Sequence, residues 1–208
     1  MAISLEKGKK VNLQKKQNAG LGEILVNLNW NTKPAKQGFF ASLMGPKGSG
    51  GIDLDLGCLF ELKNGRKGAI QALGNSFGSL QHEPYIALDG DDRTGAVSTG
   101  ENLRIDGNRI AEIKRVLVYT FIYEGVANWQ QADATVTIKY PGAEDLIVKM
   151  DTYNSSNIMC GLVLLENLND ETFSVEKIVQ FYQGQDVYKR QIPARKPCRW
   201  KTAFWLHF

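Results

Sequence analysis

Apolar and polar residues alternate along much of this chain. The clearest case is residues 23–30, in which Ile24, Val26, Leu28 and Trp30 fall on one side. Because successive side chains of a strand point to opposite faces, this run predicts a half-buried β-strand. Other alternating or short apolar runs predict further strands at residues 52–62, 68–73, 84–88, 115–123, 134–140, 146–150, 159–168 and 172–182.

The predicted strands are separated by short turns rich in glycine, asparagine and proline, as at residues 63–66 and 141–142. Residues 3–13 have apolar positions on either side of a Lys-Gly turn, which predicts a short hairpin. Residues 115–123 are the best candidate for a central strand, and only residues 107–113 suggest a helical turn. Many short strands with few helices predict a mostly-β fold, namely an antiparallel two-sheet β-sandwich.

A length of 208 residues suits one large domain or two small ones. We assign residues 1–185 to a single β-sandwich domain and treat residues 31–51 as a flexible surface insertion within it. The alternative for the insertion is a docking segment, since residues 39–44 form a small apolar patch.

The net charge of +3 is unevenly distributed. Residues 186–208 hold six basic side chains and one acidic side chain, and the rest of the chain is mildly acidic. The overall charge is therefore no argument for nucleic-acid binding. We interpret residues 186–208 as foreign to the domain, introduced by a frameshift or in sequence assembly. The alternative is a basic, aromatic tail that contacts membranes or nucleic acid.

The apolar runs are shorter than a membrane span, and the first sixteen residues lack the apolar core of a signal peptide. We therefore expect a cytoplasmic protein. The three cysteines, Cys58, Cys160 and Cys198, show no close pair and no metal-binding spacing. Cys58 and Cys160 lie in apolar runs, so buried thiols are the better interpretation.

Carboxylates are concentrated beside glycines in two segments. The first is residues 51–57, where Asp53 and Asp55 are two positions apart on a predicted strand and so share one face. Two neighbouring carboxylates repel each other unless a positive charge lies between them. Asp53 and Asp55 are therefore candidate ligands of a cation, and the alternative is that they lie on a solvated strand edge.

The second acidic segment is residues 88–102, which combine four acids with three glycines. Calcium takes six to eight oxygen ligands on a backbone that wraps around the ion, and this loop has those properties. It is not an EF-hand, because the glycine and the closing glutamate each come one residue late. Magnesium requires a strict octahedral geometry, which a flexible loop provides less well than the adaptable coordination of calcium. Zinc is disfavoured because no His or Cys lies near these acids in the sequence. A solvated acidic loop is the alternative.

Several of these segments together resemble a known family. Residues 52–59, 71–77, 85–95 and 122–129 are similar to the TerA-like branch of the TerD domain family. The resemblance covers roughly residues 1–185. It implies a two-sheet β-sandwich, TerD-like, with acidic Gly-rich loops that bind calcium. Family members occur in bacterial tellurite-resistance and general stress operons, and the resemblance implies no enzymatic activity.

The resemblance also implies partners and ligands. We expect a scaffold or sensor that works with other tellurite-resistance or stress proteins, with peripheral membrane association through those partners and no nucleic acid. Residues 90–95 match the first half of the family's loop motif, whereas the second half is weakened to residues 100–102. One calcium ion is therefore expected and a second is in doubt. Loop chemistry and the resemblance together give the candidate ligands Asp53, Asp55, Asp89, Asp91, Asp92 and Glu101.

Other functions remain open at this point. A calcium-dependent, lectin-like carbohydrate-binding module is the main alternative. A glycoside hydrolase would need a flanking acid pair, for which Asp53 and Asp91 are the candidates. Direct reduction of tellurite would need reactive thiols, and Cys58 and Cys160 could meet in the core. His82 lies in a predicted surface turn without a nucleophile nearby.

Overall fold

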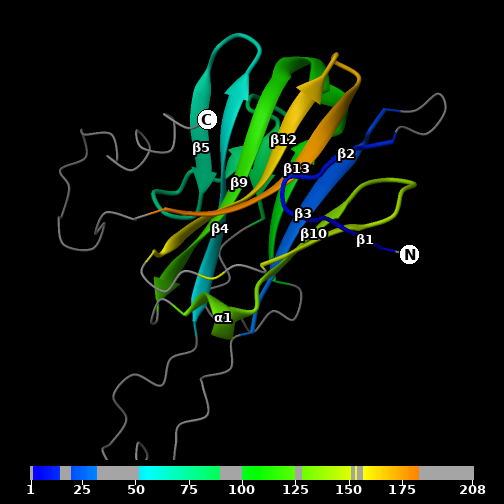
Figure 1. Ribbon diagram of the computed structural model, residues 1–208. Helices are drawn as coiled ribbons and strands as arrows, with labels where there is room; N and C mark the ends of the chain where they lie inside the picture. The colour runs from blue at the N-terminus through cyan, green and yellow to red at the C-terminus, as the bar shows by residue number, and fades with distance from the viewer. Residues whose placement is uncertain are drawn as a thin grey trace, which may run out of the picture.

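Two β-sheets stacked face to face make up the computed structural model (Figure 1). It describes residues 2–14, 20–31, 52–89, 100–124, 128–150, 153 and 157–182. Sheet A has seven strands in the order β1 (Ile3–Ser4), β11 (Leu146–Lys149), β10 (Thr135–Lys139), β3 (Glu23–Asn29), β8 (Glu101–Asp106), β7 (Ile86–Leu88) and β6 (Gly78–Ser79). Sheet B has six, in the order β2 (Lys10–Asn12), β13 (Thr172–Tyr182), β12 (Met159–Leu168), β9 (Ile113–Glu124), β4 (Asp53–Leu62) and β5 (Lys67–Gln71).

The mostly-β, two-sheet architecture predicted from the sequence is confirmed. Strand pairs are antiparallel except β1 with β11, which is parallel. The long apolar run predicted as a central strand is β9, which pairs with β4 on one side and β12 on the other. The predicted helical turn is a 3-10 helix, η2 (Gly107–Glu112). Of the insertion predicted at residues 31–51, residues 32–51 lie outside the described residues, as do residues 186–208, predicted as a tail.

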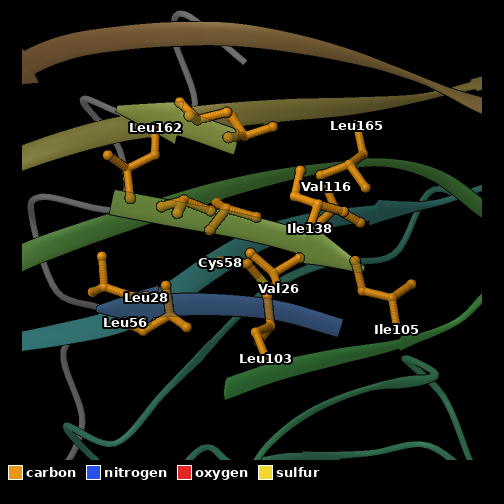
Figure 2. Packing of buried hydrophobic residues seen from close by; sticks show 14 of the residues in the cluster. Val26, Leu28, Leu56, Cys58, Leu103, Ile105, Val116, Ile138, Leu162 and Leu165 are labelled. Atoms are coloured by element: carbon orange, nitrogen blue, oxygen red, sulfur yellow. The ribbon is translucent and has the colours of Figure 1, made fainter. Parts of the chain in front are cut away.

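The core lies between the sheets, where core-facing side chains of both sheets meet (Figure 2). Ile24, Val26 and Leu28, the alternating apolar positions of β3, have no solvent exposure. Full burial of one such side chain stabilises the fold by about 1.5–3 kcal/mol. The alternation predicted from the sequence therefore corresponds to the core-facing side of the strand.

Sheet B also carries apolar side chains on its other side, away from the core. We call this the outer apolar face. Its buried residues are Leu59, Ala69, Leu117, Tyr119 and Met159, with Phe121, Leu164, Ile178 and Tyr182 half-buried around them. The strands β4, β9 and β12 are thus apolar on both sides, which explains why they appear in the sequence as continuous apolar runs.

The hairpin predicted at residues 3–13 does not form. β1 pairs with β11 in sheet A, and β2 pairs with β13 in sheet B. The turn between them crosses from one sheet to the other, and it is flanked by Leu5 and Leu13, which are 3% and 2% exposed. Two separate sheet edges, instead of one hairpin, let both leucines enter the core.

Two elements of the structure, β8 and α1 (Trp129–Ala132), were not predicted from the sequence. β8 occupies part of the segment predicted as an acidic loop. The short helix α1 lies at one end of the sandwich (Figure 1). No helix among the described residues is both long and apolar enough to cross a membrane.

Trp129 fixes α1 to the sandwich. Its indole Nε1 donates a hydrogen bond to the Asn157 carbonyl at 2.6 Å, and its ring packs edge-on against Phe181 with centroids 5.5 Å apart. The Asn128 side chain caps the helix by accepting from the Gln131 amide at 3.1 Å. Because the tryptophan is 1% exposed, most of its surface contributes to the stability of the core.

Candidate functional site

The first part of the predicted site is the beginning of β4, which two side chains hold in place. Trp30 Nε1 donates to the Ile52 carbonyl at 2.9 Å, and Thr120 Oγ1 donates to the Asp55 carbonyl at 2.9 Å. Ile52, Leu54 and Leu56 belong to the core cluster. By strand alternation Asp53 and Asp55 face away from the core and share one side of β4, as their spacing predicts.

Glu101 links sheet A to the beginning of β4. It is the first residue of β8 and lies on the same, core-facing side as Leu103 and Ile105. Its Oε2 accepts a hydrogen bond from the Leu56 amide at 2.6 Å, and the side chain is buried.

This contact lies where β4 extends beyond its neighbouring strand. The β4–β5 pairing ends at Gly57 with Gln71, so Leu56, the residue directly before Gly57, has no partner residue on β5. The Glu101 carboxylate thus accepts from the strand edge where β5 has ended. It also brings a negative charge to the backbone next to Asp55, from a segment far away in the sequence.

Asp89 lies at the beginning of the acidic loop, directly after β7 in sheet A. Its amide donates to the Asn102 carbonyl at 3.0 Å, which holds the two ends of the loop together. Its carboxylate Oδ1 lies 2.5 Å from Nε of Arg104, and the same guanidinium also pairs with Glu23. The hydrogen bonds to Asp89 and Glu23 raise the pKa of Arg104. The charge of Asp89 is therefore compensated within sheet A.

Gly100 controls how the chain enters β8 after the acidic loop. Its φ is +67°, and a Cβ built there would lie 2.0 Å from the Leu28 carbonyl oxygen. Both the backbone conformation and the close approach to β3 require glycine. The second end of the loop is consequently fixed against sheet A one residue before Glu101.

Four of the six predicted ligands lie among the described residues. The structure brings Glu101 to the β4 backbone beside Asp55, and it directs Asp89 to Arg104. Asp91 and Asp92 lie outside the described residues. Asp53, Asp55 and Glu101 have additional polar or electrostatic interactions within the chain.

Within the described ranges, no three His, Cys, Asp or Glu side chains are grouped closely enough to hold a metal ion. A calcium ion needs six to eight oxygens, so a complete set at this place requires oxygens from residues 90–99. Of the placed carboxylates, those of Asp55 and Glu101 are buried, that of Asp53 is half-buried and that of Asp89 is exposed, and carboxylate oxygens are the ligand type that a hard cation of this kind prefers.

Sequence reasoning missed the roles of Arg104 and Glu23. It also placed Glu101 in a loop, although Glu101, Leu103 and Ile105 alternate with polar residues. That alternation is the signal of a half-buried strand and would have placed Glu101 on its core-facing side. The pairing of Asp89 with Arg104 has no comparable local signal, because it depends on the register between β7 and β8.

The two cysteines of the described part do not form a reactive pair. Cys58 on β4 and Cys160 on β12 both face the core, and β9 lies between their strands. Strands spaced about 4.8 Å apart put them about 10 Å apart across the sheet, beyond disulfide reach. Burial raises the pKa of Cys58 well above its usual range and that of Cys160 to about 12. Neither thiol is suited to nucleophilic or redox chemistry.

We therefore expect Cys58 and Cys160 to resist iodoacetamide in the folded chain and to react fully in guanidinium. Peptide mass spectrometry after a short pulse of reagent measures each cysteine separately. A buried thiol reacts only through opening of the structure, so labelling should be at least about 100-fold slower than in the unfolded chain. Rapid labelling of either residue in the native state would contradict this placement and would reopen thiol-based chemistry.

The fold and the site define a class: a two-sheet β-sandwich with an acidic loop between two adjacent strands of one sheet. The model of the TerD domain matches residues 1–141. The chain belongs to the TerD domain family.

Three curated proteins show the same relationship. The chain is 39% identical to "Tellurium resistance protein TerA" from Alcaligenes sp. over 90% of this chain and 54% of that protein. It is 34% identical to "Stress response protein SCP2" from Bacillus subtilis (strain 168), over 62% of this chain and 65% of that protein. It is 30% identical to "Tellurium resistance protein TerX" from Serratia marcescens, over 60% of this chain and 64% of that protein. The chain thus spans about half to two thirds of the length of these relatives.

Solved structures support the fold. The crystal structure of a homologue of telluride resistance protein (TerD) from Streptomyces coelicolor A3(2) superposes with a TM-score of 0.52 at 16% identity, covering 81% of this chain and 94% of that one. A crystal structure of a protein of unknown function gives a TM-score of 0.57 at 14% identity, covering 80% and 93%. At these identities the likeness concerns the fold alone.

Proposed function

We propose that this chain is a non-enzymatic, calcium-binding domain that acts in tellurium resistance and the bacterial stress response. The names of the TerA, TerX and SCP2 relatives support the biological role. One observation carries the calcium proposal: Glu101 Oε2 lies 2.6 Å from the Leu56 amide, so a carboxylate from the end of the acidic loop reaches β4 beside Asp55.

The charges at this place favour a bound cation. Asp55 is 4% exposed and Glu101 is 3% exposed, and each adds a negative charge close to the beginning of β4. Buried carboxylates are costly unless positive charge or hydrogen-bond donors compensate them. The intervening residues 90–99 add Asp91, Asp92 and two glycines on a backbone able to wrap around a large ion. Calcium therefore fits better than magnesium or zinc, for the reasons of ligand number and type.

The position of the site suggests a role as scaffold or sensor. The loop joins β7 to β8 in sheet A, and Glu101 connects its end to β4 in sheet B. An ion bound by the loop would thus stabilise both sheets at this end of the sandwich. We propose that the calcium-loaded surface is recognised by other tellurite-resistance or stress proteins in the cytoplasm, through which the domain associates with membranes.

Calcium should raise the melting temperature of the full chain. A ligand that binds only the native state at 100 times its Kd stabilises that state by about 2.7 kcal/mol. For a chain of this size, this corresponds to about 5–10 °C. Differential scanning calorimetry in EDTA and in millimolar calcium measures the shift, with isothermal titration calorimetry giving the stoichiometry. Magnesium at the same concentration should give a smaller shift.

Three variants test where the ion binds. Asp91→Ala should abolish most of the calcium shift, whereas Asp170→Ala should keep it. Asp170 is a suitable control because its carboxylate forms an exposed ion pair with Lys63 at 2.7 Å. Glu101→Gln keeps an acceptor for the Leu56 amide and removes the charge, so it should weaken the calcium response with little change in EDTA. A calcium shift of the same size in all three variants, or none in the parent chain, would exclude this site.

A further inference from the structure

Asp89 and Glu101, the acids at the two ends of the acidic loop, project from opposite faces of sheet A. In β8, Leu103 belongs to the core, so Glu101 shares its side and Arg104 lies on the other side. In β7, Leu88 is buried in the core, so Asp89, the next residue, faces the same outer side as Arg104. The ion pair between Asp89 and Arg104 agrees with this placement.

A single calcium ion cannot bind both of these carboxylates directly. The oxygens that bind one calcium ion lie about 2.3–2.6 Å from it, so any two of them are at most about 5 Å apart. Glu101 Oε2 accepts from the Leu56 amide of sheet B, whereas the Asp89 carboxylate is held by Arg104 on the far side of sheet A. The backbone of sheet A therefore lies between the two carboxylates, and each is bound to a donor on its own side.

Arg104 holds Asp89 together with Glu23. Its Nε lies 2.5 Å from Asp89 Oδ1, and its Nη1 pairs with Glu23. An isolated exposed ion pair contributes little, but a guanidinium that donates to two carboxylates from different atoms fixes both of them in one geometry. β3, β8 and the end of β7 are thus joined across the outer side of sheet A.

The backbone of Asp89 is fixed at the same point. Its amide donates to the Asn102 carbonyl at 3.0 Å, one residue beyond the last registered pair of β7 and β8, Leu88 with Leu103. Asp89 is also the last residue that the structure describes before the loop. Both its side chain and its backbone are therefore held by β8 where the chain leaves sheet A.

We infer that Asp89 is a positioning residue of the calcium site, acting through Arg104, and not one of the ligands. This assignment rests on the proposed calcium binding, and it replaces the direct role expected for Asp89 from the sequence. The contact with Arg104 fixes the first end of the loop relative to Glu101. Fixing a binding loop in advance reduces the entropy that is lost when the ion binds, so Arg104 becomes a determinant of calcium affinity.

A double-mutant cycle in the full chain separates the two roles. Asp89→Asn removes the charge with little change in shape, and Arg104→Gln removes its partner. Titration calorimetry with calcium gives Kd for the parent chain, both single variants and the double variant, after circular dichroism has shown that each one folds. A positioning role predicts that each single variant weakens binding about 3- to 10-fold and that the double variant is no weaker than either, because both changes break one contact.

A direct ligand predicts a different pattern. Arg104→Gln would then release the Asp89 carboxylate for the ion and strengthen calcium binding. Asp89→Asn would weaken binding by the same factor whether Arg104 is present or absent, because the ligand would be lost in both backgrounds. Either of these results overturns the inference.

Glu23→Gln is the matched control for charge. It removes a carboxylate from the same guanidinium as Asp89→Asn does, but it leaves the contact between Asp89 and Arg104 in place. In physiological salt, one exposed charge about 10 Å from an ion changes its affinity by about 2-fold at most. Kd should therefore stay within about 2-fold of the parent value. A loss of affinity equal to that of Asp89→Asn would show that net charge alone matters and would overturn the positioning role.

Amide hydrogen exchange in EDTA tests the anchor without calcium. Exchange of the Asp89 amide, followed by NMR, should be at least about 10-fold faster in Arg104→Gln than in the parent chain, because the end of β7 opens more often. The Met150 amide is the control, since it donates to the Ala134 carbonyl at 3.2 Å, also one residue beyond a strand pair of sheet A, and should keep its rate.

The exchange measurement also separates this inference from the proposed function. Unchanged exchange at Asp89 in Arg104→Gln would overturn the inference even if calcium binds to the parent chain. If the parent chain bound no calcium, the proposed function would fail, and faster exchange at Asp89 alone would still support the anchoring of the loop end by Arg104.

Discussion

Replacing Gly100 with alanine should destabilise the native state by on the order of 4 kcal/mol and lower the melting temperature by about 10 °C. Two effects add at this position. The positive φ of +67° is unfavourable for alanine, and the new Cβ would lie 2.0 Å from the Leu28 carbonyl oxygen, which is backbone and cannot move away alone. Urea unfolding followed by circular dichroism gives the free energy of unfolding directly.

Gly65→Ala is the matched control for this prediction. Gly65 also has a positive φ, +85°, but a Cβ there would meet nothing within 4 Å. It should therefore lose only about 1 kcal/mol, the cost of the backbone conformation. If both variants lost the same stability, the close approach of Gly100 to β3 would be refuted. Gly100→Ala should also reduce the calcium shift, because it displaces the end of the acidic loop relative to Glu101.

Replacing Trp129 with alanine should cost about 3–5 kcal/mol and lower the melting temperature by about 10 °C or more. The side chain is 1% exposed, packs against Phe181 and donates a hydrogen bond to the Asn157 carbonyl. Its removal leaves a large cavity under α1 and takes away the donor for that carbonyl. Thermal and urea unfolding measure the loss.

The Trp129→Phe variant separates the contribution of ring packing from that of the indole hydrogen bond to the Asn157 carbonyl. Phenylalanine keeps much of the contact with Phe181 and removes only the indole N–H, so the expected loss is about 1–3 kcal/mol. Leu168→Ala is a surface control, since Leu168 is 38% exposed, and should change stability by less than about 1 kcal/mol. A Trp129→Ala variant as stable as the Leu168→Ala variant would show that α1 is not anchored by this residue.

The alternating segments were the most predictable part of the fold. β3 and β10 follow the alternation of the sequence, because one side of each strand lies in the core and local pattern determines which residues are buried. The pairing of β10 with β11 was equally accessible, since a Pro-Gly turn connects them. In these cases the information lies within a few consecutive residues.

Pairing between distant segments was not predictable in the same way. The sequence around the Lys-Gly turn fits a hairpin, yet β1 and β2 pair with strands more than a hundred residues away. For the site, the shared side of Asp53 and Asp55 follows from their spacing, whereas the hydrogen bond from Leu56 to Glu101 depends on how sheet A stacks on sheet B. Such contacts are set by the tertiary structure and leave no local pattern.

The pairing of β2 with β13 also constrains how the molecule is made. Val11 on β2 lies opposite Val175 on β13. β2, near the beginning of the chain, can therefore complete its edge of sheet B only after β13, the last described strand, has been synthesised. Such long-range closure slows folding, because the entropy of a long loop must be overcome before the contact forms. During synthesis the growing chain therefore exposes the unpaired edge of β2 until β13 has left the ribosome, and an unpaired strand edge of this kind is prone to aggregation.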